Sequence, residues 1–191
     1  MRLRRDVEAA VEAGADAVGF VLADSPRRVS PDIARSLGAD LSIQTVLVTV
    51  DTEPEQLMRW VDDTGASGVQ PHGRYAQAAG DAAVARGLLV LHPVAMDAAV
   101  DPAEIPADRI PLLDNSQPTR SGGTGTPFDW SLTEGVQRDF VLAGGLGPDN
   151  VAAAITRVRP WGVDASTGLE SAAGVKDPER IRAFVREAKN Q

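Results

Sequence analysis

The sequence contains no cysteine among its 191 residues. This absence excludes a disulfide, a thiolate metal ligand and a thiol nucleophile within the chain as printed. The sequence has only two histidines, and their spacing matches no common metal-binding pattern. We therefore predict that the protein has no metal site.

Long apolar runs are also absent, since no run reaches the ~18 residues that a membrane-spanning helix needs. The segment Met1–Arg5 leads into an amphipathic helix and lacks the features of a signal peptide. A formal net charge of −8 argues against nucleic acid or an anionic membrane as a partner. We expect a cytoplasmic protein that binds neither of them.

Short apolar runs alternate with helical patterns along the chain. Seven runs are typical of strands buried on both faces: Ala17–Leu22, Gln44–Val50, Gly68–Gln70, Leu88–Val94, Ile110–Leu113, Phe140–Ala143 and Gly162–Ala165. Helical patterns lie before and between them: Asp6–Gly14, Pro31–Leu37, Glu53–Thr64, Tyr75–Arg86, Pro148–Val158 and Pro178–Lys189. This alternation predicts right-handed βαβ units and a parallel sheet.

No linker or repeat divides the chain, so we predict a single domain over residues 1–191. A closed (β/α)8 barrel needs eight strands, and here a helix precedes the first strand without a strand of its own. We therefore predict a (β/α)8 TIM barrel whose first strand is missing, with seven recognisable strands. A doubly wound open sheet is the alternative, although the glycine turn typical of dinucleotide binding is absent.

Two glycine-bearing turns follow the last two predicted strands. The first contains Gly144 and Gly145, and the second consists of Ser166, Thr167 and Gly168. Glycine lets backbone N–H groups approach an anion closely, and a helix that starts after the turn adds the positive end of its dipole. Because (β/α)8 barrels hold sugar phosphates at this place, we predict a phosphate site.

Three side chains at predicted strand ends are candidates for chemistry. Asp114 could transfer a proton at the mouth of a barrel, although a capping aspartate in a loop is equally typical. Arg27 could bind a substrate carboxylate with two N–H groups, or could simply be solvated. His72 could contact substrate, but a histidine at a strand end is more often a structural hydrogen-bonding residue.

Three further features lie near these strand ends. Asp164 precedes the second glycine turn and could orient it by accepting backbone N–H bonds. The polar segment Asn115–Pro127 has the length and composition of a lid or binding loop. Asp129 is expected to cap a short helix, with Trp130 packed against the core.

Several motifs together resemble one family, phosphoribosylanthranilate isomerase of tryptophan biosynthesis. They occur in family order and at family spacing over nearly the whole chain: EAGADAVGFV (Glu12–Val21), SPRRVSP (Ser25–Pro31), VQPHG (Val69–Gly73), LLD (Leu112–Asp114) with GGTGTPFDWSL (Gly122–Leu132), LAGGLGPDNV (Leu142–Val151) and RPWGVDASTGLESAAGVKDP (Arg159–Pro178).

The resemblance implies a (β/α)8 barrel that catalyses an Amadori rearrangement without metal or organic cofactor. Asp114 would be the general acid that opens the furanose ring, and Arg27 would contact the anthranilate carboxylate. His72 would lie among the substrate-binding residues. The phosphate would be held by Gly144, Gly145, Ser166, Thr167 and Gly168. The partner would be a small phosphorylated substrate, and the protein would be a monomer or a homodimer.

One departure from the family concerns the general base. Family members begin with a strand reading like K-I-C-G, whose cysteine takes the C2′ proton, and Met1 aligns just after that glycine. We therefore expect either an isomerase that is severely impaired in the printed chain or a non-catalytic barrel that binds sugar phosphates. The related ProFAR isomerisation of histidine biosynthesis is a third reading, but its first-strand aspartate is also absent.

Overall fold

In the computed structural model, residues 1–96, 105–114, 129–134 and 136–191 are described. Seven strands form one parallel sheet in which each strand pairs with the next one along the chain. They are β1 (Ala17–Val21), β2 (Gln44–Val50), β3 (Gly68–His72), β4 (Leu89–Ala95), β5 (Ile110–Asp114), β6 (Val141–Leu142) and β7 (Gly162–Val163). All seven predicted strands are confirmed.

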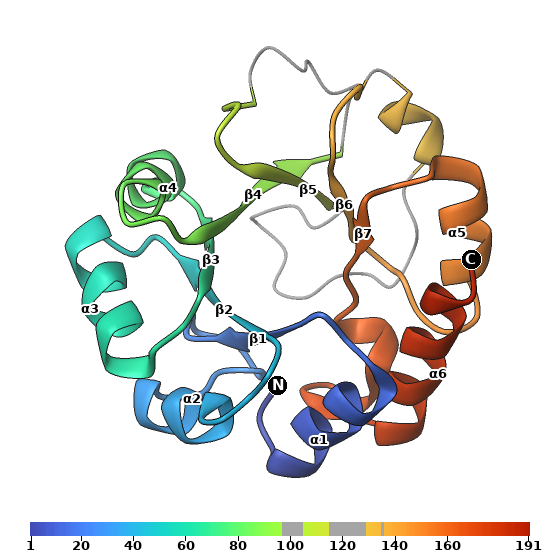
Figure 1. Ribbon diagram of the computed structural model, residues 1–191, viewed down its shortest axis with the longest axis horizontal. Helices are drawn as coiled ribbons and strands as arrows, with labels where there is room; N and C mark the ends of the chain where they lie inside the picture. The colour runs from blue at the N-terminus through green and yellow to red at the C-terminus, as the bar shows by residue number, and fades with distance from the viewer. Residues whose placement is uncertain (97–104, 115–128, 135) are drawn as a thin grey trace.

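The described residues contain six α-helices, and Figure 1 shows them outside the strands. They are α1 (Arg4–Ala13), α2 (Pro31–Gly38), α3 (Pro54–Thr64), α4 (Ala76–Val84), α5 (Val151–Val158) and α6 (Pro178–Lys189). A doubly wound sheet would place its first strand in the middle of the order. The sequential order β1 to β7 is that of a barrel, so the doubly wound alternative is wrong.

Local sequence explains where several helices begin and end. The Ser30 hydroxyl accepts a hydrogen bond from the Ile33 N–H at the start of α2, where Pro31 fits the first turn. The Asp177 carboxylate caps α6 in the same way. Helix α1 ends at Gly14, whose φ of 88° closes the last turn at no steric cost.

Two shorter elements complete the described part of the last units. Asp129 caps the 3₁₀ helix η2 (Trp130–Thr133) by accepting from the Ser131 N–H at 3.0 Å, and Trp130 packs against the core. Both expectations for this segment are confirmed. The predicted loop Asn115–Pro127 lies outside the described residues.

An antiparallel hairpin follows the short 3₁₀ helix η3 (Thr167–Leu169) and was not predicted. It consists of β8 (Glu170–Ala172) and β9 (Val175–Lys176). These strands are too short to show an alternating pattern, which is why the sequence analysis missed them. Thr167 and Gly168 of the second glycine turn lie within η3, and the hairpin, rather than a long helix, follows this turn.

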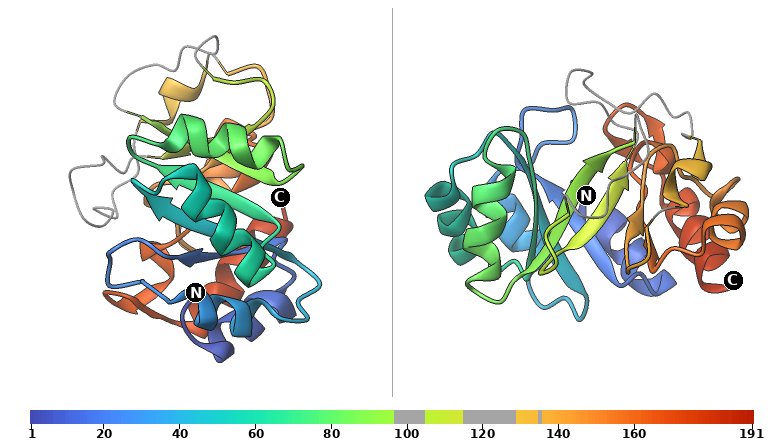
Figure 2. Two further views of the ribbon diagram at one scale, coloured as in Figure 1. Left: turned by 90° about the vertical axis from the view of Figure 1, so that its left-hand side faces the viewer. Right: turned by 90° about the horizontal axis from the view of Figure 1, so that it is seen from above.

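Apolar side chains of the strands point alternately to the two faces of the sheet and form two separate layers. Leu113 and Leu142 belong to the large core between the sheet and the helices. Leu112, Val141 and Ala143 form a separate buried cluster on the opposite face. Since successive side chains of a strand point to opposite faces, this second cluster lies inside the ring of strands. Figure 2 shows the ring from two further sides.

The two end strands, β1 and β7, do not pair with each other in the described residues. Helix α1 packs against α6 across this seam, and Lys189 of α6 forms an ion pair of 2.7 Å with Asp16. The outer edge of β1 is partly covered, because the Gly19 carbonyl accepts from the Met1 backbone nitrogen and the Val21 carbonyl accepts from the Val29 N–H.

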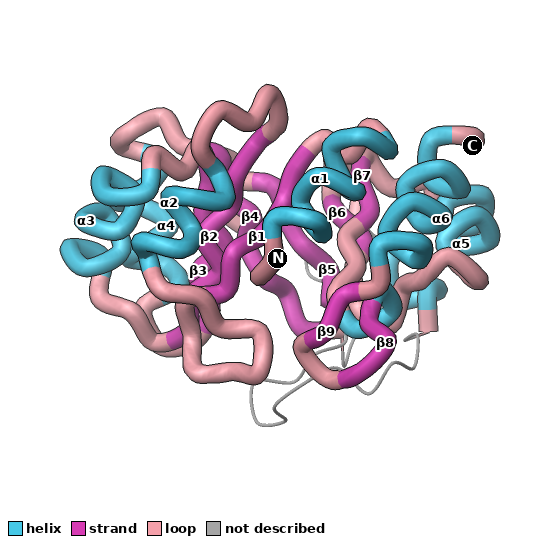
Figure 3. Tube along the Cα trace, turned by 90° about the horizontal axis from the view of Figure 1, so that it is seen from below, coloured by secondary structure: helices cyan, strands magenta, loops and turns pink. Residues whose placement is uncertain are grey.

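The β8–β9 hairpin lies beside the loop that follows β1. The Arg2 guanidinium donates to the Pro26 carbonyl at 2.8 Å and to the Gly174 carbonyl at 3.3 Å. Figure 3 shows the N-terminus, α1 and the hairpin close to one another. Side chains therefore join the two ends of the sheet where backbone pairing does not.

We predict that Ile181→Ala lowers the free energy of unfolding by about 2–5 kcal/mol, since this side chain of α6 is 1% exposed. Ile33→Ala on α2 is the matched control, because Ile33 is 46% exposed and should change stability by less than about 0.5 kcal/mol. Urea unfolding followed by circular dichroism measures both. Equal losses for the two variants would contradict the packing described for α6.

Candidate active site

The polar candidates lie at the carboxyl ends of the parallel strands. His72 is the last residue of β3, Asp114 is the last residue of β5, and Asp164 directly follows β7. Asp114 shares its strand face with Leu112, which belongs to the inner cluster. The carboxyl ends of barrel strands form the catalytic face of this architecture. The structure thus brings these predicted residues to one mouth.

His72 is half-buried and hydrogen-bonded. The amide nitrogen of Gln70, two residues earlier on the same face of β3, lies 3.0 Å from its Nε2 atom. Burial lowers the pKa of His72, and the negative charge of Asp114 raises it in part. A neutral ring can accept the hydrogen bond from Gln70, whereas a protonated ring cannot. Burial therefore favours the neutral form of His72, and the charge of Asp114 partly opposes that effect.

The pKa of Asp164 depends on desolvation and on charged neighbours, among them Asp114 and Lys176. Asp164 is exposed at the surface, but protein atoms surround its carboxyl group on several sides. This partial desolvation raises the pKa of Asp164. The charge of Asp114 raises that pKa further, while Lys176 opposes the shift. The Asp164 carboxylate also accepts the Ala165 N–H, as expected for a residue that orients the following turn.

The two glycine turns are in direct contact. Gly144 and Gly145 adopt φ values of 81° and 71°, which glycine reaches without steric cost. The Asn150 side chain fixes the first turn, since its amide donates to the Gly145 carbonyl at 3.0 Å. A Cβ atom on Gly168 would lie 1.9 Å from the Leu146 carbonyl oxygen, so the second turn packs closely against the first.

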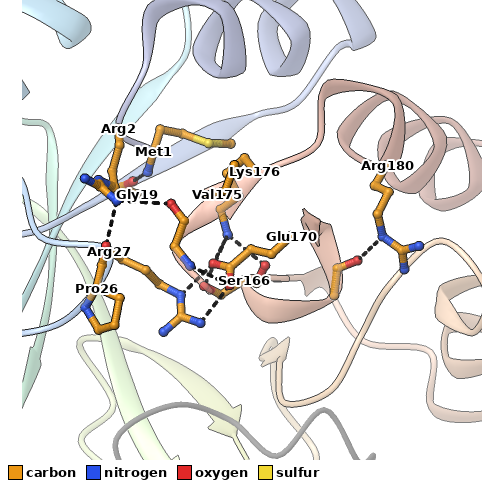
Figure 4. A network of polar contacts seen from close by, with 12 residues as sticks. Met1, Arg2, Gly19, Pro26, Arg27, Ser166, Glu170, Val175, Lys176 and Arg180 are labelled. Carbon is orange, nitrogen blue, oxygen red and sulfur yellow. Dashed lines mark hydrogen bonds and ion pairs between the residues drawn. The ribbon is translucent and has the colours of Figure 1, made fainter. Parts of the chain in front are cut away.

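Arg27 reaches the mouth from the loop after β1, where it meets a residue that the sequence analysis missed. Its Nε and Nη2 atoms donate to the two carboxylate oxygens of Glu170 at 2.7 and 2.9 Å (Figure 4). Lys176 donates to Glu170 at 3.2 Å and to the Ser166 carbonyl at 2.7 Å. We call Arg27, Glu170 and Lys176 the seam cluster.

The seam cluster favours the charged form of Glu170. Burial alone would raise the pKa of Glu170, but the hydrogen bonds and charges of Arg27 and Lys176, with the Gly174 N–H, lower it overall. Desolvation lowers the pKa of Lys176, and Glu170 counteracts it. One carboxylate thus pairs with a guanidinium and an ammonium group in this cluster.

Within the described ranges, no group of three or more His, Asp or Glu side chains is arranged to hold a metal ion. In the same ranges, no helix is long and apolar enough to cross a membrane.

A ring of parallel strands with helices outside and polar side chains at the carboxyl ends defines a (β/α)8-barrel enzyme. Residues 1–187 match the family described as N-(5'phosphoribosyl)anthranilate (PRA) isomerase. The chain belongs to this family.

Relatives of known name or structure agree with this assignment. The N-(5'-phosphoribosyl)anthranilate isomerase of Desulforudis audaxviator is 43% identical over 191 residues, which is 94% of this chain and 90% of that protein. A solved phosphoribosyl anthranilate isomerase from Thermus thermophilus superposes with a TM-score of 0.85 at 30% identity, covering 100% of this chain and 96% of that one.

A further solved phosphoribosyl anthranilate isomerase was crystallised in complex with reduced 1-(o-carboxyphenylamino)-1-deoxyribulose 5-phosphate. Its TM-score is 0.79 at 32% identity, and the superposition covers 100% of this chain and 96% of that one. Together these likenesses confirm the predicted family and the (β/α)8 fold.

We predict that Gly168→Ala lowers the free energy of unfolding by about 1–3 kcal/mol, because a backbone carbonyl must move to admit the new methyl group. Binding of ribose 5-phosphate, measured by calorimetry, should weaken in parallel. Gly162→Ala is the control, since its Cβ atom would only reach ordinary contact with Val141 at 3.5 Å. Unchanged phosphate binding in Gly168→Ala would contradict a role for this turn.

We also predict that the pKa of His72 lies below the ordinary histidine value of 6.5 and that Asp114→Asn lowers it further. The reason is that the variant removes the charge that raises this pKa. Because the folded-state pKa is lowered, the contribution of His72 to stability is complete above ~6.5 and is lost as the pH falls through the folded-state pKa.

Nuclear magnetic resonance of the two imidazole signals measures this shift. His92 is an internal control, because its charged neighbours are Arg109, Asp108 and Asp81 rather than Asp114. A His72 midpoint that rises or stays constant in Asp114→Asn would show that the two groups do not interact.

Proposed function

We propose that the chain converts N-(5'-phosphoribosyl)anthranilate to 1-(2-carboxyphenylamino)-1-deoxyribulose 5-phosphate, an Amadori rearrangement in tryptophan biosynthesis. Family membership supports this proposal. The observation that carries it is the meeting of a carboxyl group, an arginine and two glycine turns at one mouth of the ring. We further propose that the protein works in the cytoplasm as a monomer or a homodimer.

The two ends of such a substrate are anionic, and each would have its own binding group. The phosphate would be held by backbone groups of Gly144, Gly145, Ser166, Thr167 and Gly168. The anthranilate carboxylate would pair with Arg27, whose planar fork suits a carboxylate. His72 would line the space between them as a neutral hydrogen-bonding group. The bound analogue of the solved relative carries the same two anionic groups.

Asp114 would act as the general acid. It would protonate the furanose ring oxygen, so that the bond from this oxygen to C1′ breaks and the ring opens to an iminium ion. Loss of the C2′ proton to a base would then give an enolamine, which tautomerises to the ketone of the product. No metal or organic cofactor is required for these proton transfers.

Removal of the C2′ proton needs a general base, and the printed chain lacks the group that the family uses for it. The resemblance assigns it to a cysteine on a leading strand, and these 191 residues contain no cysteine. Loss of a general base typically costs about 10²–10⁴-fold in rate. We therefore propose that these residues alone bind substrate with much reduced turnover. Binding with no turnover at all would favour the alternative of a non-catalytic barrel.

The test compares turnover of the printed chain with a version extended before Met1 by a strand reading K-I-C-G, using the fluorescence of the anthranilate substrate. We expect the extended version to be about 10²–10⁴-fold faster. Asp114→Asn in the extended version should lose activity by a similar factor while it still binds the reduced product analogue. An extended chain that neither turns over the substrate nor binds the analogue would refute the proposal.

A further inference from the structure

Glu170 is a buried and fully paired charged residue that the proposed reaction leaves without a task. It begins β8, and its side chain is only 6% exposed. Both of its carboxylate oxygens pair with Arg27, a residue 143 positions away in the sequence. A buried carboxylate is costly unless its bonding capacity is filled, so this placement needs a reason.

The surroundings of Glu170 hold it in one position. The Gly174 N–H donates to one carboxylate oxygen at 3.1 Å, and the Lys176 ammonium donates to the other at 3.2 Å. Both donors belong to the β8–β9 hairpin, which closes back on its own first residue. Figure 4 shows Glu170 between Arg27 and Lys176. Glu170 is therefore a fixed acceptor rather than a mobile surface acid.

The pairing decides which edge of Arg27 remains for a ligand. A guanidinium has five N–H groups, and Glu170 takes one from Nε and one from Nη2. Two of the three remaining groups lie along the Nη1–Nη2 edge, which can receive a second carboxylate with two parallel bonds. Arg27 keeps 17% of its side-chain surface exposed, so it is not sealed off by the pairing.

We propose that Glu170 is the positioning residue that turns the free Nη1–Nη2 edge of Arg27 toward the carboxylate of the substrate. The proposal rests on the proposed function. Arginine has many rotamers, and freezing them before binding removes an entropic cost that the ligand would otherwise meet. Glu170 thus raises affinity for the carboxylate end of the substrate without touching it.

Lys176 extends this arrangement to the other end of the ligand. Its ammonium donates to Glu170 and also to the carbonyl of Ser166, in the second glycine turn. The carboxylate-binding arginine and the phosphate-binding turn are therefore fixed to one another through two side chains. This link sets the spacing between the two anionic groups that a ligand must have.

The test measures binding of two ligands to the full printed chain by calorimetry, which requires no general base. One ligand is the reduced product analogue, and the other is its counterpart without the ring carboxylate. We expect Glu170→Gln to weaken the first by about 10- to 100-fold and the second by less than about twofold. In an Arg27→Ala background, Glu170→Gln should cause no further loss.

Two controls separate positioning from folding. Glu179→Gln replaces a glutamate of α6 whose side chain is 84% exposed, and it should bind both ligands normally. Glu170→Asp keeps the charge but is shorter by one methylene, so it supports the fold while spoiling the two-bond pairing. It should again weaken only the carboxylate ligand.

The outcomes are distinct. Equal weakening of both ligands, or no weakening of either, would overturn the role of Glu170 and leave the proposed function standing. Additive losses in the Arg27→Ala background would also overturn it, because Glu170 would then act independently of Arg27. Failure of the unmodified chain to bind either ligand would overturn the proposed function together with this inference.

Discussion

Contact between the two ends of the sheet governs both the shape and the chemistry of this protein. Strands β1 and β7 are not joined by backbone pairing in the described residues. Their approach depends instead on the packing of α1 against α6 and on the pairing of Arg27 with Glu170. Every residue of the proposed site stands on a strand end or a turn of this ring, so its geometry depends on that closure.

The charge distribution shows how an acidic protein can hold an anionic ligand. The chain has a formal net charge of −8, which disfavours a doubly anionic substrate at long range. At the mouth, however, the seam cluster places two cations around one carboxylate, within reach of the glycine turns. Backbone N–H groups add attraction without adding net charge. In the proposed site, this local arrangement would outweigh the global field.

Local patterns predicted most of the fold, whereas long-range contacts escaped them. Each strand has its own apolar run, and Gly144, Asp114 and His72 stand directly at strand ends, so their shared edge follows from the parallel topology. The role of Glu170 could not be predicted in this way. Its partner Arg27 lies 143 residues earlier, and the hairpin that carries it has too few residues for a periodic pattern.

Because side chains rather than backbone pairing join β1 and β7 in the described part of the chain, a bound ligand can help to hold the two ends of the sheet together. In a closed ladder, the backbone sets the distance between the loop after the first strand and the turn after the last. Here that distance is set by the side-chain bonds of Glu170 to Arg27 and of Lys176 to Glu170 and Ser166. A ligand that spans Arg27 and the second glycine turn would bridge the same seam. Its binding energy would then add to the stability of the closed ring, because a ligand that binds only the native arrangement stabilises it by mass action.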